Sequence, residues 1–163
     1  MIEWYGDNYY KDGLPTKSSK LYLEVKAFVE ELGLEDIFQL KPAVKDLRTV
    51  YQTADAMILP SFFEGCSNAI CESLSCGLPV LTSDVCDNGI FVQNGESGLL
   101  FDPLDPSSIA DAIVRFCETS AVERAAMGVA GRAYAVEQFS QARFLDEYLS
   151  LIRKVSETHR ARR

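Results

Sequence analysis

The feature that most restricts the fold of this sequence is the alternation of short, continuous apolar runs with longer segments of helical periodicity. The clearest run is residues 56–59 (AMIL), closed by Pro60, and residues 79–82 (PVLT) are expected to be the next buried strand. A strand that is apolar at every position is typical of a parallel sheet covered on both faces. The pattern therefore predicts an α/β fold: a Rossmann-like parallel sheet with helices on both faces.

The remaining elements follow from the same periodicities. Strands are also expected at 1–5, 36–40 and 99–101, and helices at 21–32, after Asp46, at 68–75, after Asp105, at 121–136 and at 141–155. Ser67 is the expected N-cap of the helix at 68–75, and Gly77 follows its end. Residues 7–19 and 83–98 are predicted to be loops. We expect one domain over 1–139, then a helix and basic tail over 140–163.

Charge and cysteine content exclude several classes of protein. The 163 residues carry a formal net charge of -8, which disfavours binding to nucleic acid. The five cysteines include no C-x-x-C pair, and His159 is the only histidine, so we expect no metal site and free thiols in a reducing cytoplasm. No apolar run is long enough to span a membrane. The basic residues 160–163 are interpreted as a solvated tail.

The segment with the most chemical information is residues 60–72, which follows one buried strand and opens a helix. Ligands of open parallel sheets bind beyond the carboxyl ends of the strands, and a helix N-terminus offers free N–H groups to an anion. Gly65 lacks a side chain, so a ligand can approach the main chain. Glu64 and Glu72 are placed to accept hydrogen bonds from hydroxyls on two parts of a long ligand. The alternative is that Glu64 is an ordinary loop residue and Glu72 only favours the helix start.

This segment resembles the E-x7-E motif of glycosyltransferase family 4, also called glycosyl transferases group 1. Its two glutamates are Glu64 and Glu72, with seven residues between them. Other segments resemble the family at matching spacing; they are 53–56 (TADA), 59–61 (LPS), 67–69 (SNA), 76–80 (CGLPV), 94–100 (NGESGLL) and 105–106 (DP). The resemblance runs from Ile2 to about Phe139.

The resemblance implies the second, donor-binding half of a GT-B fold, without its first strand. The catalytic-site glutamate would be Glu64, in a binding role at the donor sugar and not as a nucleophile. Glu72 would hold the ribose, and the main chain around Gly65, Cys66, Ser67 and Asn68 would face the sugar and diphosphate. The implied activity is retaining transfer of a hexosyl group from a UDP- or GDP-sugar to a glycan or lipid-linked acceptor, with no cofactor and no metal.

The sequence departs from the family pattern in two places. The acceptor domain and the first strand of the donor domain, with its "GRL" and "KG" residues, have no counterpart in the chain. Without that strand, the strands at 2–5 and 56–59 lose a shared neighbour. We therefore expect exposed edges and self-association. In the loop 84–90, Cys86 and Asp87 replace paired glycines and Ile90 replaces a glutamate.

Several readings stay open. The implied partners are the nucleotide sugar and the missing N-terminal acceptor domain, with peripheral membrane association of a full-length protein. Instead of an enzyme part, the chain could be a non-catalytic nucleotide-sugar-binding fragment or part of a GT-B-type nucleotide-sugar epimerase. A dinucleotide oxidoreductase is disfavoured because no G-x-G-x-x-G follows a strand.

Overall fold

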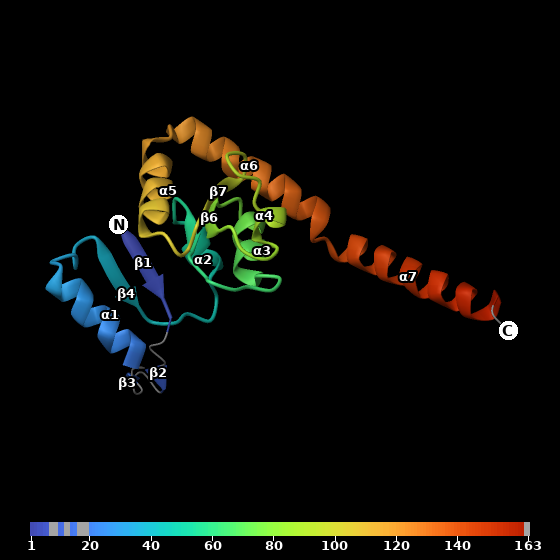
Figure 1. The fold of residues 1–163 in the computed structure, drawn as a ribbon, viewed down its shortest axis with the longest axis horizontal. Coiled ribbons are helices and arrows are strands. Elements are labelled where there is room, and N and C mark those ends of the chain that lie inside the picture. The colour runs from blue at the N-terminus through green and yellow to red at the C-terminus, as the bar shows by residue number, and fades with distance from the viewer. Residues whose placement is uncertain (7–9, 12–13, 16–19, 162–163) are drawn as a thin grey trace. The chain divides into compact units, whose positions relative to one another are not determined.

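The computed structural model describes residues 1–6, 10–11, 14–15 and 20–161, and side chains are described for all of these except 10, 11, 14, 15, 160 and 161. The chain divides into two compact units, Met1–Leu47 and Arg48–Arg163. Each is described by itself below (Figure 1). The basic side chains of 160–163 lie outside the described residues.

The first unit contains a two-stranded parallel sheet and one long helix. Strand β1 (Ile2–Tyr5) pairs with β4 (Phe38–Lys41), with Trp4 opposite Leu40. Helix α1 (Lys20–Glu31) ends before Gly33, whose φ of 63° is the conformation that lets a chain leave a helix. The loop expected over 7–19 is wrong in its described part, because β2 (Tyr10–Lys11) pairs antiparallel with β3 (Leu14–Pro15). Two-residue strands are too short to produce an alternating pattern.

The second unit contains a three-stranded parallel sheet in the order β5–β6–β7. The strands are β5 (Met57–Leu59), β6 (Val80–Ser83) and β7 (Gly98–Phe101). Its helices are α2 (Arg48–Tyr51), α3 (Asn68–Ser75), α4 (Asn88–Phe91), α5 (Pro106–Glu118), α6 (Ala121–Gln138) and α7 (Gln141–Ala161). The expected elements of this unit are all present. Helix α4 is an addition, inside a segment predicted to be loop.

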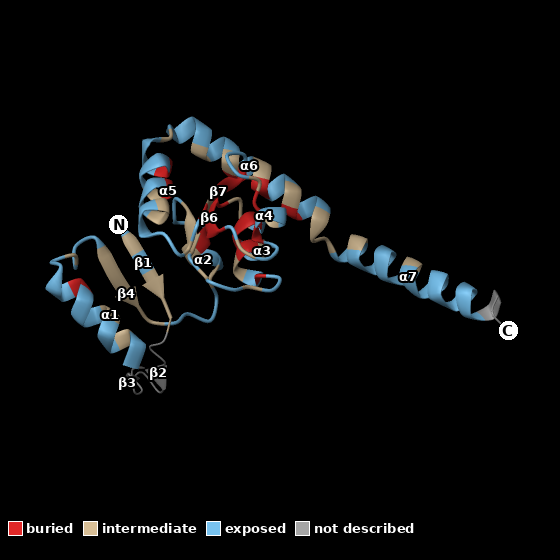
Figure 2. Ribbon diagram, viewed as in Figure 1, coloured by how far each residue is buried: buried red, intermediate tan, exposed pale blue. Residues whose placement is uncertain are grey.

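Both faces of this sheet are covered, because alternate residues of its strands enter different cores. The core on the α3 side is formed by Ile70, Leu74, Val80, Val92 and Ala135. The core on the α5 side is formed by Leu81, Leu99, Phe101, Ala112 and Phe116. Complete burial of an aliphatic side chain contributes about 1.5–3 kcal/mol, so these two cores hold the unit together. Figure 2 shows the buried residues concentrated on the sheet and on α3 and α4.

The parallel strands therefore form two separate sheets, β1–β4 and β5–β6–β7, instead of one continuous sheet. Among the described residues, β1 pairs with β4 alone and β5 with β6 alone, so each has one edge without a backbone partner. These are the two strands expected to lose a shared neighbour. The α/β class, with parallel strands and helices on both faces, is confirmed.

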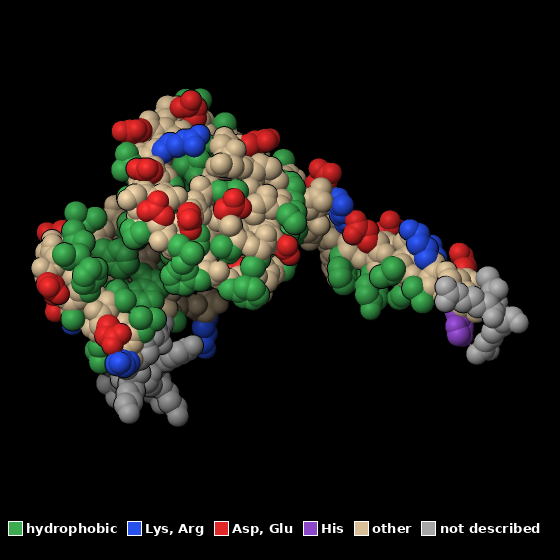
Figure 3. Space-filling model, in the orientation of Figure 1, with side chains coloured by type: hydrophobic (Ala, Val, Ile, Leu, Met, Phe, Trp, Pro, Cys, Tyr) green, Lys and Arg blue, Asp and Glu red, His purple; other side chains and the backbone are tan. Residues whose placement is uncertain are grey.

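Helix α7 differs from the other helices in its exposure (Figure 2). Its larger apolar side chains are all solvent-exposed: Phe144, Leu145, Tyr148, Leu149, Leu151, Ile152 and Val155. Figure 3 shows hydrophobic side chains gathered along one side of this helix. The compact units divide after Leu47. The division of the chain at 139/140 stays a prediction.

Candidate functional site

The connection from β5 to α3 forms the centre of the candidate site. It runs from Pro60 to Ser67, beyond the carboxyl end of β5. Ser67 is the N-cap residue, as expected, with extended backbone dihedral angles (φ -71°, ψ 111°), but its side chain makes no capping hydrogen bond. The expected N-cap position is therefore confirmed, whereas the hydroxyl does not occupy the first-turn N–H groups. Those donors, with the partial positive charge of a helix N-terminus, remain available to an anion.

Glu64 is held in the connection by a short hydrogen bond. Its side chain is half-buried, and Ser61 Oγ donates to Glu64 Oε1 at 2.6 Å. Ser61 is in turn fixed to the neighbouring strand, because Ser83 Oγ donates to the Ser61 carbonyl oxygen at 2.6 Å. The carboxylate therefore sits at the carboxyl end of the sheet, outside the packed core. Its second oxygen remains able to accept hydrogen bonds from a ligand hydroxyl.

Sequence analysis missed a buried polar group behind this loop. Asn88 Nδ2 donates to the Ser83 carbonyl oxygen at 3.0 Å and to Thr82 Oγ1 at 3.1 Å. Thr82 Oγ1 donates to the Leu59 carbonyl oxygen at 3.1 Å. Asn88 lies in the segment 83–98, which the sequence predicts to be a loop. The only sequence signal for the network was the presence of polar Thr82 and Ser83 at the end of an otherwise apolar strand.

Glu72 has different surroundings from Glu64. It is an exposed residue of α3. Burial, followed by the negative charge of Glu72 and then that of Cys76, raises the pKa of Tyr51 at the end of α2. Glu72 therefore lies near enough to Tyr51 for its charge to act there, whereas Glu64 is bonded to Ser61. Two carboxylates in separate surroundings suit contacts with two parts of one long ligand.

Three of the residues between the two glutamates are open to solvent, whereas Ser67 and Ile70 are buried. Gly65, Cys66 and Asn68 are exposed, and a Cβ atom built on Gly65 would meet no atom within 4 Å. Space for a ligand next to this main chain is therefore present. Cys71, one turn into α3, is half-buried, and its burial, with nearby Cys66 and Glu72, raises the pKa of its thiol to about 11.

The segment 84–90 that departs from the family pattern follows β6 and extends into α4. Cys86 has a φ of 49°, in the left-handed region that glycine adopts without strain. Ile90, at the position of a family glutamate, is exposed, and its carbonyl oxygen accepts a hydrogen bond from Tyr134 at 2.9 Å. The loop thus keeps a glycine-like backbone at Cys86 without a glycine.

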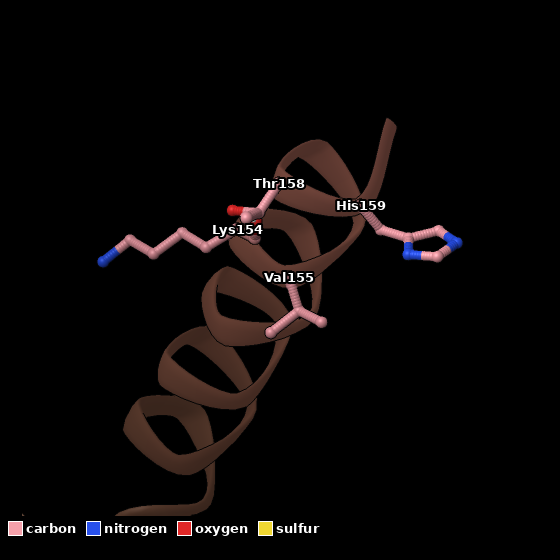
Figure 4. Close-up of a pocket in the computed structure, with 4 residues that line it drawn as sticks. All are labelled: Lys154, Val155, Thr158 and His159. Atoms are coloured by element: carbon pink, nitrogen blue, oxygen red, sulfur yellow. The ribbon is translucent and has the colours of Figure 1, made fainter. Parts of the chain in front are cut away.

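Hollows elsewhere on the surface do not suit a nucleotide sugar. One of about 310 Å³ is lined by Lys154, Val155, Thr158 and His159, all from α7 (Figure 4). A single exposed helix cannot surround a ligand of this size with converging polar groups. In the described part of the chain, no three His, Cys, Asp or Glu side chains are grouped as a metal site would need.

Within residues 1–161, as far as they are described, no helix is both long and apolar enough to cross a membrane.

Comparison with known proteins identifies the family. Residues 15–119 match the sequence profile of glycosyl transferases group 1. The D-inositol 3-phosphate glycosyltransferase of Mycolicibacterium smegmatis is 32% identical over 135 residues, which are 82% of this chain and 30% of that protein. Its counterpart in Paenarthrobacter aurescens is 33% identical over 88 residues, 53% of this chain and 22% of that protein. The chain thus spans less than a third of the length of these relatives.

Solved structures agree on the fold. A sucrose-phosphate synthase from Thermosynechococcus elongatus superposes with a TM-score of 0.79 at 22% identity, covering 96% of this chain and 38% of that one. Anabaena HepE in complex with UDP-glucose superposes with a TM-score of 0.73 at 20% identity, covering 82% of this chain and 36% of that one. Taken with the motif and the sheet, these matches show that the chain belongs to the glycosyl transferases group 1 family and has the fold of one part of a longer GT-B-type glycosyltransferase.

Proposed function

We propose that this chain is the donor-binding part of a retaining glycosyltransferase that moves a hexosyl group from a UDP- or GDP-sugar to a glycan or lipid-linked acceptor. The observation that carries the proposal is the Glu64 carboxylate, tethered by Ser61 beside the uncapped N-terminus of α3. This arrangement offers an acceptor for sugar hydroxyls and donors for a diphosphate at the same edge of one sheet.

The proposed roles follow from the surroundings of each residue. Glu64 accepts hydrogen bonds from the donor sugar, and exposed Glu72 accepts them from the ribose hydroxyls. The main chain of Gly65, Cys66, Ser67 and Asn68 faces the sugar and diphosphate, because it lies at the start of α3 and the space beside Gly65 is open. Glu64 acts here by binding and orienting the sugar, and is not assigned the part of nucleophile.

In the proposed reaction, the bond between the anomeric carbon and the diphosphate oxygen breaks, and its electron pair leaves with the nucleoside diphosphate. The acceptor hydroxyl loses its proton, and its oxygen bonds to the anomeric carbon with the original configuration kept. The partial positive charge at the start of α3 stabilises the negative charge that develops on the departing diphosphate. The proposal assigns no step to a metal or cofactor.

The acceptor is assigned to protein outside these 163 residues, because the compared residues make up less than a third of the length of these relatives. The relatives' names support the choice of probes. UDP-glucose is bound by the HepE structure, which makes it the first donor to test. The acceptor of the relatives, inositol 3-phosphate by their name, is a first candidate for transfer by a full-length protein.

Calorimetric titration of the 163-residue chain with UDP, UDP-glucose, GDP and GDP-mannose tests the proposal. Glu72→Ala should weaken nucleotide and nucleotide sugar alike, by about tenfold, because hydrogen bonds to a charged group are lost. Glu64→Ala should reduce the extra affinity that the sugar gives and leave the nucleotide alone nearly unchanged. Glu137→Ala, an exposed glutamate of α6, is the matched control. Equal affinities for all four proteins would exclude this site.

A second candidate is a nucleotide-sugar-binding module that transfers nothing. It is favoured by the loop 84–90, where Cys86 and Asp87 replace the paired glycines and Ile90 replaces the glutamate of the family pattern. Joining the chain to a GT-B acceptor domain and following release of UDP from UDP-glucose separates the two. Binding without any release of UDP in the joined protein supports the module.

A further inference from the structure

We propose that Ser83 and Asn88 are positioning residues that hold the Glu64 carboxylate towards the donor sugar, through Ser61. This inference rests on the proposed donor-binding role of Glu64. Neither residue belongs to the E-x7-E segment, and Asn88 lies in α4, a helix that the sequence pattern did not predict. The two act without touching the ligand.

The first link is the bond that fixes Glu64. Ser61 Oγ lies 2.6 Å from Glu64 Oε1, a short distance typical of an O–H group donating to a charged oxygen. Only one of the two carboxylate oxygens is engaged by this bond. Ser61 therefore selects one orientation of the carboxylate and leaves the other oxygen for a sugar hydroxyl.

The second link fixes Ser61 itself. The completely buried Ser83 hydroxyl donates to the Ser61 carbonyl oxygen at 2.6 Å, across 22 residues of sequence. Ser83 is the last residue of β6, the central strand of the three-stranded sheet. The loop that carries Glu64 is thus joined to the most firmly paired strand of the unit.

The third link fixes the end of β6. The Asn88 side-chain amide is completely buried, and its Nδ2 donates both to the Ser83 carbonyl and to Thr82 Oγ1. Thr82 passes the connection to the Leu59 carbonyl at the end of β5. The Asn88 amide therefore connects the carboxyl ends of β5 and β6. The loop that carries Glu64 begins at the end of β5.

The side-chain oxygen of Asn88 has different surroundings from its nitrogen. Among the described residues, Asn88 Oδ1 accepts no hydrogen bond although it is buried. An unsatisfied buried carbonyl destabilises a protein. The two bonds donated by Nδ2 offset that cost and are what the site gains from an asparagine at this position.

A purely structural role for these bonds predicts a different result from a positioning role. If the bonds only stabilise the unit, removing one should lower the melting temperature and leave the preference for sugar over nucleotide unchanged. If they position Glu64, the preference falls. The informative quantity is therefore the ratio of the UDP-glucose and UDP affinities in each variant.

The experiment uses calorimetry on the 163-residue chain with UDP and UDP-glucose, and with GDP and GDP-mannose. Ser61→Ala, Ser83→Ala and Asn88→Asp should each reduce the sugar-dependent ratio by about threefold to tenfold, the range of one hydrogen bond. Ser61→Thr keeps the hydroxyl and should restore the ratio. Ser73→Ala is the matched control, because Ser73 is also completely buried and also donates to a backbone carbonyl, that of Leu78, outside this network.

The outcomes are distinguishable. If the wild-type chain binds none of the four compounds, or gains no affinity from the sugar, the proposed function fails and this inference fails with it. If the wild type prefers a nucleotide sugar and Ser61→Ala and Ser83→Ala keep the preference, only the positioning role is overturned. An equal loss of preference in Ser73→Ala would also overturn it. Should Asn88→Asp fail to fold, Ser83→Ala still decides the question.

Discussion

Cys86 has a backbone conformation that its side chain disfavours. Its φ of 49° lies in the left-handed region, where a Cβ atom costs roughly 1–2 kcal/mol. Glycine at this position would remove that strain, at a smaller entropic cost of about 0.5–1 kcal/mol. The family resemblance, which places a glycine here, agrees with the backbone of this chain.

The Cys86→Gly variant should consequently be as stable as the wild type or up to about 1 kcal/mol more stable. Urea unfolding measures the change. Cys117→Gly serves as the contrast, because Cys117 is also exposed but lies within α5, where glycine in place of cysteine should cost about 0.3 kcal/mol and relieve no strain. A clear loss of stability in Cys86→Gly would show that the thiol contributes more than the strain removes.

The Cys71 thiol should be the slow one in alkylation by iodoacetamide. Its pKa is raised to about 11, mainly by burial, so very little reactive thiolate is present at pH 8. The pKa of this thiol in the folded chain exceeds the ordinary value of 9.0. The contribution of Cys71 to the free energy of unfolding is therefore complete below pH 9 and is lost as the pH rises towards 11. The alkylation rate of each cysteine can be measured by mass spectrometry of the labelled peptides. This rate should be lower for Cys71 than for the exposed Cys66 and Cys117. Comparable rates at pH 8 would contradict the assignment.

The sequence identified the residues of the candidate site better than it identified the hydrogen bonds between them. Glu64, Glu72 and Gly65 were identified because they share one short segment. The hydrogen bonds from Ser83 to Ser61 and from Thr82 to Leu59 join residues 22 and 23 positions apart. Such pairings depend on strand register, which the periodicity of a single chain does not specify.

Helices α3 and α6 pack against each other through glycine. A Cβ atom built on Gly128 of α6 would overlap the carbonyl oxygen of Gly77, just past the end of α3. One built on Gly131 would lie 2.7 Å from Leu74 Cδ2, inside the core on the α3 side. The close approach therefore requires a residue without a side chain on α6, and it fixes the helix that opens the site.

Gly128→Ala should destabilise the unit by about 1–3 kcal/mol, because two backbones must separate to admit a methyl group. Thermal unfolding followed by circular dichroism measures the effect. Gly65→Ala is the control, since a Cβ there meets nothing, and its stability should stay within about 0.5 kcal/mol of the wild type. Equal melting temperatures for Gly128→Ala and the wild type would refute the close-packing argument.

Elements with strong boundary signals were predicted well, and short ones were not. Asp105 accepts a hydrogen bond from the Ser107 N–H at the start of α5, as its position before Pro106 indicated. Ser120 and Glu123 form a capping box at the start of α6. Helix α4 has only four residues, and its Asn-Gly start has the composition of a turn. A single helical turn has too few positions to show a period.

For the molecule as a whole, the sequence predicted the parallel strands and the unpaired edges of β1 and β5. Both predictions came from the order of apolar runs and from the family resemblance. The exposure of the apolar face of α7 was not predicted, because an amphipathic pattern shows which side of a helix is apolar and not whether anything covers it.

The isolated chain is expected to self-associate. Each of β1 and β5 presents one unpaired row of backbone donors and acceptors, the arrangement that recruits further strands. Sedimentation velocity at rising concentration should show a growing share of dimers and larger species. A shortened chain ending at residue 139 removes the exposed face of α7, and association should persist in it if strand edges are responsible. A single monomer peak for the full chain at all concentrations would exclude the prediction.

Strand β6 connects parts of the second unit that are otherwise separate. Val80 enters one core, Leu81 enters the other, and Thr82 and Ser83 anchor the loop of the site. Four consecutive residues thus contact three different sets of neighbours, so a substitution at any of them disturbs a partner elsewhere in the unit. Among related sequences, we expect these four positions to vary least.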